Sequence, residues 1–405
     1  MPIELMAATE AGARLVTIAE KLSEQLAAHA AEHDRDGSYP FEAIGALKAA
    51  GYFAAPVPVE LGGLGVTSAH DLVVASSRLA RGDPSVAIGV NMHLVAVLNM
   101  ERRRQVAVAA GAERRARGFA SSLEQIARHG VVLAAAISER GQDLTRPATL
   151  ATRTESGWRI DGRKTFCTMS PAATDLYVAV TYADDDGAER YAYAMVPTDA
   201  PGVVIADDWD ALGMRASGSN SVSMERVELP ASGVRGGFRA GDPVPYMERN
   251  LVAGLFHAAA SLGIAESADA VARSGLAGRD DGHARPRMQV ADNAVDLAAA
   301  RGALSRAARL IDEHHAANPA SDGTAEELDA LFAEAQAAKA FVNEAGARVV
   351  ERALALSGGA GYVNGSLLAR AYRDVKAGAF MHPLGANRAY DHLADVALGR
   401  TTSLH

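Results

Sequence analysis

The sequence has only one cysteine, Cys167, which excludes an internal disulfide and a cysteine-rich metal site. It also lacks an excess of positive charge, because 40 lysines and arginines stand against 49 aspartates and glutamates and no basic block compensates locally. That balance argues against a nucleic-acid partner. No apolar run approaches the roughly 20 residues of a membrane helix, and the N-terminus lacks the basic and then apolar pattern of a signal peptide. We therefore expect a cytoplasmic protein without a membrane partner.

The motifs of several enzyme classes are missing too. No G-x-G-x-x-G follows a predicted strand and no G-x-x-x-x-G-K-[ST] occurs, so we expect neither a Rossmann dinucleotide site nor a P-loop. The absence of G-x-S-x-G leaves hydrolase chemistry without support. The 12 histidines are scattered, with no third ligand near any pair, and we expect no metal site.

The spacing of hydrophobic residues along the sequence has a period that changes twice. Residues 1–130 have helical periodicity, residues 131–235 form short β-type runs between turn residues, and residues 236–405 are helical again. The β runs do not alternate with helices, which predicts an antiparallel barrel or sandwich. Candidate C-terminal helices are residues 244–274, 287–314, 324–356 and 387–398. The sequence thus predicts an α+β protein with an N-terminal helical domain, a middle antiparallel β domain and a C-terminal four-helix bundle, with boundaries after residues 130 and 235.

Three strand ends in the β region carry small polar groups suited to a planar ring. They are residues 137–144, 164–170 and 213–219, and Phe166 in the second could cover the face of the ring while hydroxyl and backbone donors bind its edge. Three ordinary turns are the alternative.

Two further segments near the C-terminus could serve a binding site. Residues 357–362 contain three glycines, which permit a close backbone approach, and His382 precedes a proline that stiffens its loop. A glycine helix stop and a surface histidine are the alternatives.

These features occur in the order of a known family. Residues 41–65, 157–168, 173–175, 212–219 and 357–362, the last followed by Arg373 and Asp374, resemble segments of the acyl-CoA dehydrogenase superfamily over nearly the whole chain. The resemblance implies a flavin, usually FAD, between the β domain and the C-terminal helices, and a homotetramer in which a neighbour contributes to the cofactor site. By position it implies that Phe166 and Thr168 contact the flavin near N5, and that Gly141 and Gln142 contact its pyrimidine side. Gly358, Gly359 and Gly361 would approach the ADP or phosphate portion.

The loop that holds the catalytic base in the dehydrogenases differs here. Relatives normally carry a glutamate there, but residues 377–384 contain no carboxylate and carry His382 instead. Where other members place the base on the first long C-terminal helix, this chain has Ala253, and Glu248 is more than a turn away. The loop is more similar to the oxygenase branch, whose two-component flavin monooxygenases receive reduced flavin from a separate NAD(P)H:flavin reductase. We therefore predict a reductase-dependent monooxygenase that uses reduced FAD or FMN and O₂ on a small aromatic, heteroaromatic or amine substrate.

For that reaction the resemblance implies roles for three side chains. Thr168 would bond near N5, while His382 and His93, if they converge, would donate to the activated oxygen or deprotonate the substrate. Packed histidines with backbone hydrogen bonds are the alternative. Candidate substrate-pocket residues are Ser121, Phe256 and Phe380.

Two other functions stay open at this point. One is an acyl-thioester dehydrogenase with His382 or Glu248 as the base. The other is a flavin-binding scaffold that has lost catalysis.

Overall fold

The computed structural model describes residues 4–141, 143–277, 282–400 and 404. The N-terminal region is helical as predicted, and several of its helices begin after a residue whose side chain accepts from a free backbone N–H group. Asp83, for example, accepts from the backbone of Ser85 at 2.8 Å, and Pro84 takes the first helical position of α5. The helices are α1 (Glu10–Ala27), α2 (Ala30–Asp36), α3 (Phe41–Ala49), α4 (Ala69–Ala80), α5 (Pro84–Ala109) and α6 (Glu113–His129), with 3-10 turns at Tyr52–Ala54 and Val59–Leu61.

The middle region is one eight-stranded sheet in the order β6-β7-β3-β2-β4-β5-β8, with β1 beside β4. Most neighbours pair antiparallel as predicted, but β1 and β2 each run parallel to β4. The strands are β1 (Leu133–Ala136), β2 (Leu150–Arg153), β3 (Gly157–Cys167), β4 (Asp175–Ala183), β5 (Glu189–Pro197), β6 (Val203–Ile205), β7 (Asn220–Pro230) and β8 (Val234–Arg239). Strand β8 ends beyond the predicted domain boundary at residue 235.

The C-terminal region is a set of long helices. They are α7 (Pro243–Asn250), α8 (Ala253–Ala277), α9 (Ala284–Ala317), α10 (Ala325–Ser357), α11 (Gly359–Tyr362), α12 (Leu367–Asp374) and α13 (Ala386–Ala397), with a 3-10 helix at Val375–Phe380. A capping box opens α10, because Thr324 and Glu327 bond each other's backbone N–H groups.

One predicted helix, over residues 244–274, is instead two. The chain breaks after Asn250, whose side-chain amide donates to the carbonyl of Tyr246 at 2.8 Å. Tight i→i+3 bonds replace the regular ladder on both sides of the break, from Leu251 to Glu248 and from Leu255 to Val252. The break matters because it turns Asn250 toward the cavity described below.

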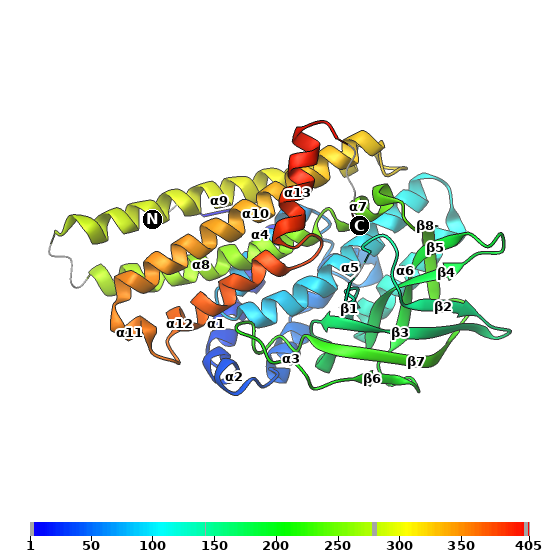
Figure 1. Ribbon diagram of the computed structural model, residues 1–405, viewed down its shortest axis with the longest axis horizontal. Helices are drawn as coiled ribbons and strands as arrows, with labels where there is room; N and C mark the ends of the chain where they lie inside the picture. The colour runs from blue at the N-terminus through cyan, green and yellow to red at the C-terminus, as the bar shows by residue number, and fades with distance from the viewer. Residues whose placement is uncertain (1–3, 142, 278–281, 401–403, 405) are drawn as a thin grey trace.

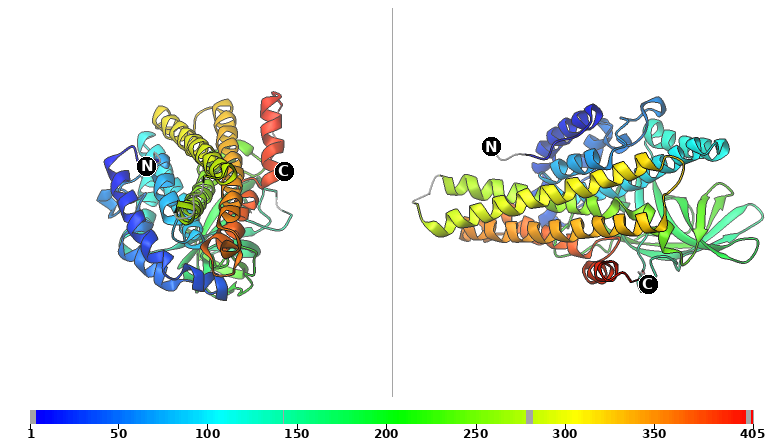
Figure 2. Two further views of the ribbon diagram at one scale, coloured as in Figure 1. Left: turned by 90° about the vertical axis from the view of Figure 1, so that its left-hand side faces the viewer. Right: turned by 90° about the horizontal axis from the view of Figure 1, so that it is seen from above.

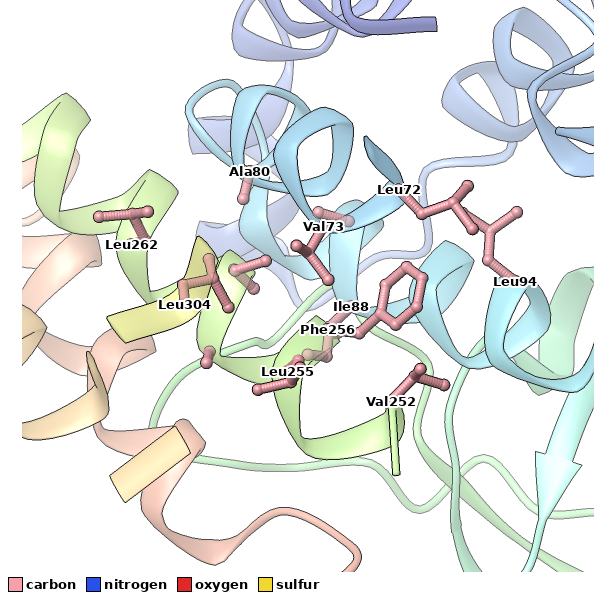
Figure 3. Packing of buried hydrophobic residues seen from close by; sticks show 14 of the residues in the cluster. Leu72, Val73, Ala80, Ile88, Leu94, Val252, Leu255, Phe256, Leu262 and Leu304 are labelled. Atoms are coloured by element: carbon pink, nitrogen blue, oxygen red, sulfur yellow. The ribbon is translucent and has the colours of Figure 1, made fainter. Parts of the chain in front are cut away.

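The largest apolar core lies where α4, α5 and α8 meet, and Figure 3 shows Leu72, Leu94 and Phe256 packed in it. The stretch Pro243–Ala277 is long and apolar enough to cross a membrane, but 94% of its most apolar window is buried inside this core. Its apolar character is therefore explained by packing between helices.

The arrangement of the three regions places their junction near the middle of the molecule. The sheet gathers at one end, and α8, α9 and α10 run lengthwise away from it (Figure 1). Figure 2 shows the N-terminal helices on one side of these long helices and α13 on the other. Helix α5 packs against both α8 and β1, so all three regions meet around it.

Candidate active site

A cavity of about 480 Å³ opens at this junction. That volume is in the range of small-molecule sites. Its walls come from α5, the ends of β1 and β3, the loop before β7, the α7–α8 break and the 3-10 helix Val375–Phe380 with the loop that follows. Of the residues predicted from sequence, the cavity brings together Phe166, Thr168, Phe380 and His382.

A bulge in β3 presents Phe166 to the cavity. The register between β3 and β7 shifts between Lys164 and Cys167, and Phe166 adopts a φ of 56°, which is uncommon for a bulky side chain. Its ring is consequently 62% exposed, although the neighbouring Cys167 is fully buried in the sheet core. Strained residues of this kind cluster at functional sites.

Thr168 follows the bulge with a hydroxyl held in a small network. Ser219 donates to Thr168 Oγ1 at 3.0 Å, and the serine hydroxyls of Ser217 and Ser219 lie 2.7 Å apart. An exposed aromatic face beside an oriented hydroxyl suits a flavin, whose ring is planar and whose edge carries nitrogens and oxygens. Phe166 would cover the ring and Thr168 would bond its edge, so the residues present fit this cofactor.

His382 also lines the cavity, from the loop after the 3-10 helix. Its Nε2 donates to Oδ1 of Asn250 at 2.7 Å, which leaves Nδ1 as the acceptor. Burial and, secondly, the ammonium of Lys339 lower the pKa of His382 to about 3. The imidazole is therefore neutral at pH 7 and acts as a hydrogen-bonding group, which differs from the near-neutral titration expected from its ordinary pKa.

No carboxylate lines this cavity among the residues that the structure describes. Three cationic side chains do, namely Arg249, Arg373 and Lys376. Glu248, one of the bases considered above, does not line the cavity, because it is buried in an ion pair with Arg103. The wall is thus mostly apolar and carries a few cationic groups, of which Arg249 pairs with Glu248 and Arg373 with Asp34. It lacks a group of ordinary carboxylate basicity.

His93 does not converge with His382. It is fully buried between α5 and β1, where Nε2 donates to the carbonyl of Phe53 at 2.9 Å and Nδ1 accepts from the backbone of Leu133 at 3.0 Å. Burial lowers its pKa to about 4. Both nitrogens are satisfied by backbone, so the structure gives His93 a packing role and places it outside the cavity lining.

Two of the predicted substrate-pocket residues also lie elsewhere. Phe256 is fully buried in the core of α4, α5 and α8 (Figure 3), and Ser121 is an exposed residue of α6. Phe380 does line the cavity, with a ring that is 80% exposed.

The predicted glycine contacts are not brought to the cavity within this chain. Gly141 has a φ of 67° in the loop after β1 but does not line the cavity, and Gln142 lies outside the described residues. Gly358, Gly359 and Gly361 sit past the end of α10, at the end of the molecule away from the sheet (Figure 1). Along α10 they are roughly 27 Å from Lys339, by the rise of an α-helix.

Sequence reasoning missed three residues that shape this site: Asn250, His257 and Lys339. His257 lines the cavity and is adjacent to Phe256, and neighbours on a helix point about 100° apart, so one faces the core and the other the cavity. A helical projection of α8 could have separated them. Asn250 and Lys339 had no local signal, because their roles arise from contacts with a loop far along the chain.

Comparison with known proteins agrees with this fold. The chain matches the acyl-CoA dehydrogenase N-terminal domain over residues 12–102, the middle domain over 134–227 and the C-terminal domain over 255–383. The amino sugar nitrososynthase DnmZ of Streptomyces peucetius is 33% identical over 398 residues, which cover 97% of this chain and 95% of that protein. The L-evernosamine nitrososynthase of a Micromonospora species is 34% identical over 403 residues, covering 96% and 91%.

A solved structure is similar over the same length. KijD3 in complex with FMN and dTDP-3-amino-2,3,6-trideoxy-4-keto-3-methyl-D-glucose has a TM-score of 0.89 at 30% identity, covering 98% of this chain and 96% of that one. Fold, site and relatives together define a flavin-dependent oxidoreductase. The chain belongs to the acyl-CoA dehydrogenase superfamily.

Proposed function

We propose that this protein oxygenates the amino group of a nucleotide-linked amino sugar, using reduced flavin and O₂. The observation that carries the proposal is the cavity beside Phe166 and Thr168, which holds a neutral imidazole and, among the described residues, no carboxylate. Two relatives are named as nitrososynthases and KijD3 was solved with FMN and an amino sugar nucleotide, which supports the amine as the substrate group.

The absent carboxylate separates this chemistry from dehydrogenation. Acyl-thioester dehydrogenation needs a base that removes a carbon-bound proton, and a histidine with a pKa of about 3 is a poor one. Oxygenation at nitrogen uses the lone pair of a neutral amine and needs no such base. The ammonium of Lys376 in the wall favours that neutral form, because a nearby positive charge disfavours a second ammonium.

The residues that line the cavity divide the work of binding and orientation. His382, fixed through Nε2 by Asn250, would accept an amine N–H at Nδ1 and orient the lone pair toward the ring. Phe380 and Phe166 would exclude water from the space between them. Bound reduced flavin would supply two electrons per O₂, so that one oxygen atom reaches the nitrogen and the other leaves as water. A first turnover gives the hydroxylamine, and a second gives the nitroso compound and two waters.

A second pocket of about 50 Å³ adjoins the cavity; it is too small for a whole nucleotide but could contact one of its groups. The two share Asn99, Tyr177, Tyr193 and Arg249. Tyr177 and Tyr193 stack with centroids 4.5 Å apart, and such aromatic surfaces bind bases. Arg235, in the second pocket, contacts only carbonyl and hydroxyl oxygens within the described chain, so its charge is free to meet a diphosphate.

A separate NAD(P)H:flavin reductase belongs to the proposal, because oxygen transfer consumes reduced flavin at each turnover. The homotetramer and the cytoplasmic location stay predictions from the sequence. So does the choice of FAD or FMN, although KijD3 was solved with FMN.

The test follows the reaction over successive turnovers, with reduced flavin in excess over the protein. The protein is mixed with photoreduced FMN, O₂ and the KijD3 ligand, and the products are identified by mass spectrometry with ¹⁸O₂. We expect a hydroxylamine and then a nitroso product, each carrying ¹⁸O, and no product from the sugar nucleotide with a hydroxyl in place of the amine. Labelled product from neither ligand, or bleaching of bound oxidised flavin by acyl-CoA, would contradict the proposal.

A further inference from the structure

A buried lysine on α10 holds the loop that carries His382. Lys339 is 2% exposed, and its ammonium donates to the backbone carbonyls of Met381, of Leu384 at 2.7 Å and, less closely, of His382 at 3.5 Å. An ammonium has three N–H donors, and these carbonyls use them. The contacts join the middle of α10 to both sides of His382, so they fix where its imidazole stands.

The charge of Lys339 is compensated by dipoles only. In the described part of the chain no carboxylate lies within ion-pair distance of its Nζ, and carbonyl oxygens are its hydrogen-bond partners. Burial lowers the pKa of Lys339 to about 7. A primary amine at this depth therefore already has a weakened preference for its charged form.

The same charge reaches the cavity wall. His257 lines the cavity, is 3% exposed, and has no hydrogen-bond partner for either ring nitrogen among the described residues. The pKa values of His257 and His382 are both lowered mainly by burial and then by Lys339. Lys339 is thus an electrostatic neighbour of the two imidazoles that a substrate would meet.

Other titratable groups lie near Lys339, either in a pocket that it also lines or as imidazoles whose pKa it lowers. They are His257 on α8, His382 on the loop, Lys376 on the 3-10 helix, Glu344 on α10 and Tyr390 on α13. Glu344 is the only carboxylate in this set, and it accepts a hydrogen bond from Tyr390. The balance of charge near the cavity is therefore positive.

Resting on the proposed function, we infer that Lys339 is a positioning residue that fixes the His382 loop and biases a bound substrate amine toward its neutral form. Its carbonyl contacts perform the first task. Its uncompensated charge performs the second, because it opposes a second ammonium in the same buried region. The bias matters for nitrogen oxygenation, since only the neutral amine has a free lone pair.

Proton release on binding tests the charge without any turnover. Titration calorimetry with oxidised FMN and the KijD3 ligand, in buffers of different ionisation enthalpy at pH 6, where Lys339 carries its charge, counts the protons released. We expect about one proton per bound amine for the wild type and for K339R, since an amine arrives protonated and binds neutral. We expect less than half of that for K339M, and none for a dTDP-sugar without an amine. The exposed Lys48 provides a matched control, and K48M should behave as wild type.

Hydrogen exchange tests the loop separately. K339M should speed amide exchange in residues 377–385 at least tenfold, while α5 and the sheet keep their wild-type rates. If the wild type releases no proton on binding the amine, or if K339M matches the wild type in both measurements, the inference fails. Wild-type proton release without any oxygenated product would instead refute the proposed function alone. If K339M does not fold, proton release by the wild type and K339R, compared between the amine ligand and the dTDP-sugar without an amine, still tests the inference.

Discussion

At the scale of single residues, two histidines that were both predicted to act in catalysis have different hydrogen bonding in the structure. Both ring nitrogens of His93 form hydrogen bonds with backbone groups of this chain. In His382 only Nε2 is bonded, to Asn250, and Nδ1 remains available as an acceptor. A nitrogen that is already bonded to buried backbone cannot reach a substrate without leaving that group unsatisfied. The number of free nitrogens, and not the residue type, decides which histidine can act.

His382→Ala should therefore reduce oxygenation more than cofactor binding. Loss of one hydrogen bond to the substrate predicts a fall in kcat/KM of roughly 10- to 100-fold. Flavin affinity, measured by fluorescence quenching, should stay within about twofold, because the proposed flavin contacts are Phe166 and Thr168. His129→Ala changes an exposed histidine and serves as the control. An equal loss of flavin affinity and turnover would argue against the substrate role of His382.

At the scale of elements, the site depends on how closely helices approach and where strands depart from regularity. Helix α8 approaches α4 so closely that a Cβ on Gly263 would lie 2.3 Å from the carbonyl oxygen of Ser77. The bulge in β3 does the opposite, since it releases Phe166 from the sheet. Close packing holds α8 in place, and α8 in turn carries His257 to the cavity.

Gly263→Ala should accordingly destabilise the fold. The added methyl group meets backbone that cannot move freely, and overpacking of this kind costs about 1–3 kcal/mol in the free energy of unfolding. Gly118 on α6 has nothing within 4 Å of a built Cβ, so Gly118→Ala should be neutral or stabilise by up to about 1 kcal/mol. Urea denaturation of both variants measures the contrast. Equal effects at the two glycines would contradict the packing argument.

At the scale of the whole molecule, a buried carboxyl joins the β region to the C-terminal helices. Oδ1 of Asp374, on α12, accepts from the backbone of Met214 at 2.6 Å, and Oδ2 has no partner among the described residues. Gly213 permits this contact, because a Cβ there would lie 2.5 Å from the backbone of Arg373. Burial, more than any neighbouring charge, raises the pKa of Asp374 to about 7.

This raised pKa makes the stability of the molecule depend on pH. The folded protein holds the proton of Asp374 up to about pH 7, but the unfolded chain loses it near the ordinary value of 3.8. The stabilisation is therefore complete below pH 3.8 and is lost as the pH rises to about 7. Asp374→Asn keeps the acceptor without the titration, and should raise stability at pH 8 by on the order of 1–4 kcal/mol and by clearly less at pH 5, where only part of the stabilisation is lost. Calorimetric unfolding at the two pH values checks this, and identical shifts at both would rule out Asp374 as the titrating group.

The order of helices, sheet and helices was predictable from the sequence, because hydrophobic period and turn residues are local properties. The Phe166–Thr168 segment and His382 were predictable through family resemblance, since each belongs to a short motif or loop. Four parts of the site could not be predicted. They are the burial of His93 and Phe256 in the core, the helix break at Asn250, the position of His257 in the cavity wall, and the hydrogen bonds from Lys339 to a loop more than 40 residues away. These depend on which face of a helix meets which distant backbone group, and only the folded chain decides that. The sequence by itself therefore determined the architecture and the class of cofactor chemistry, whereas tertiary packing decided which polar groups were already satisfied and which were left for a substrate.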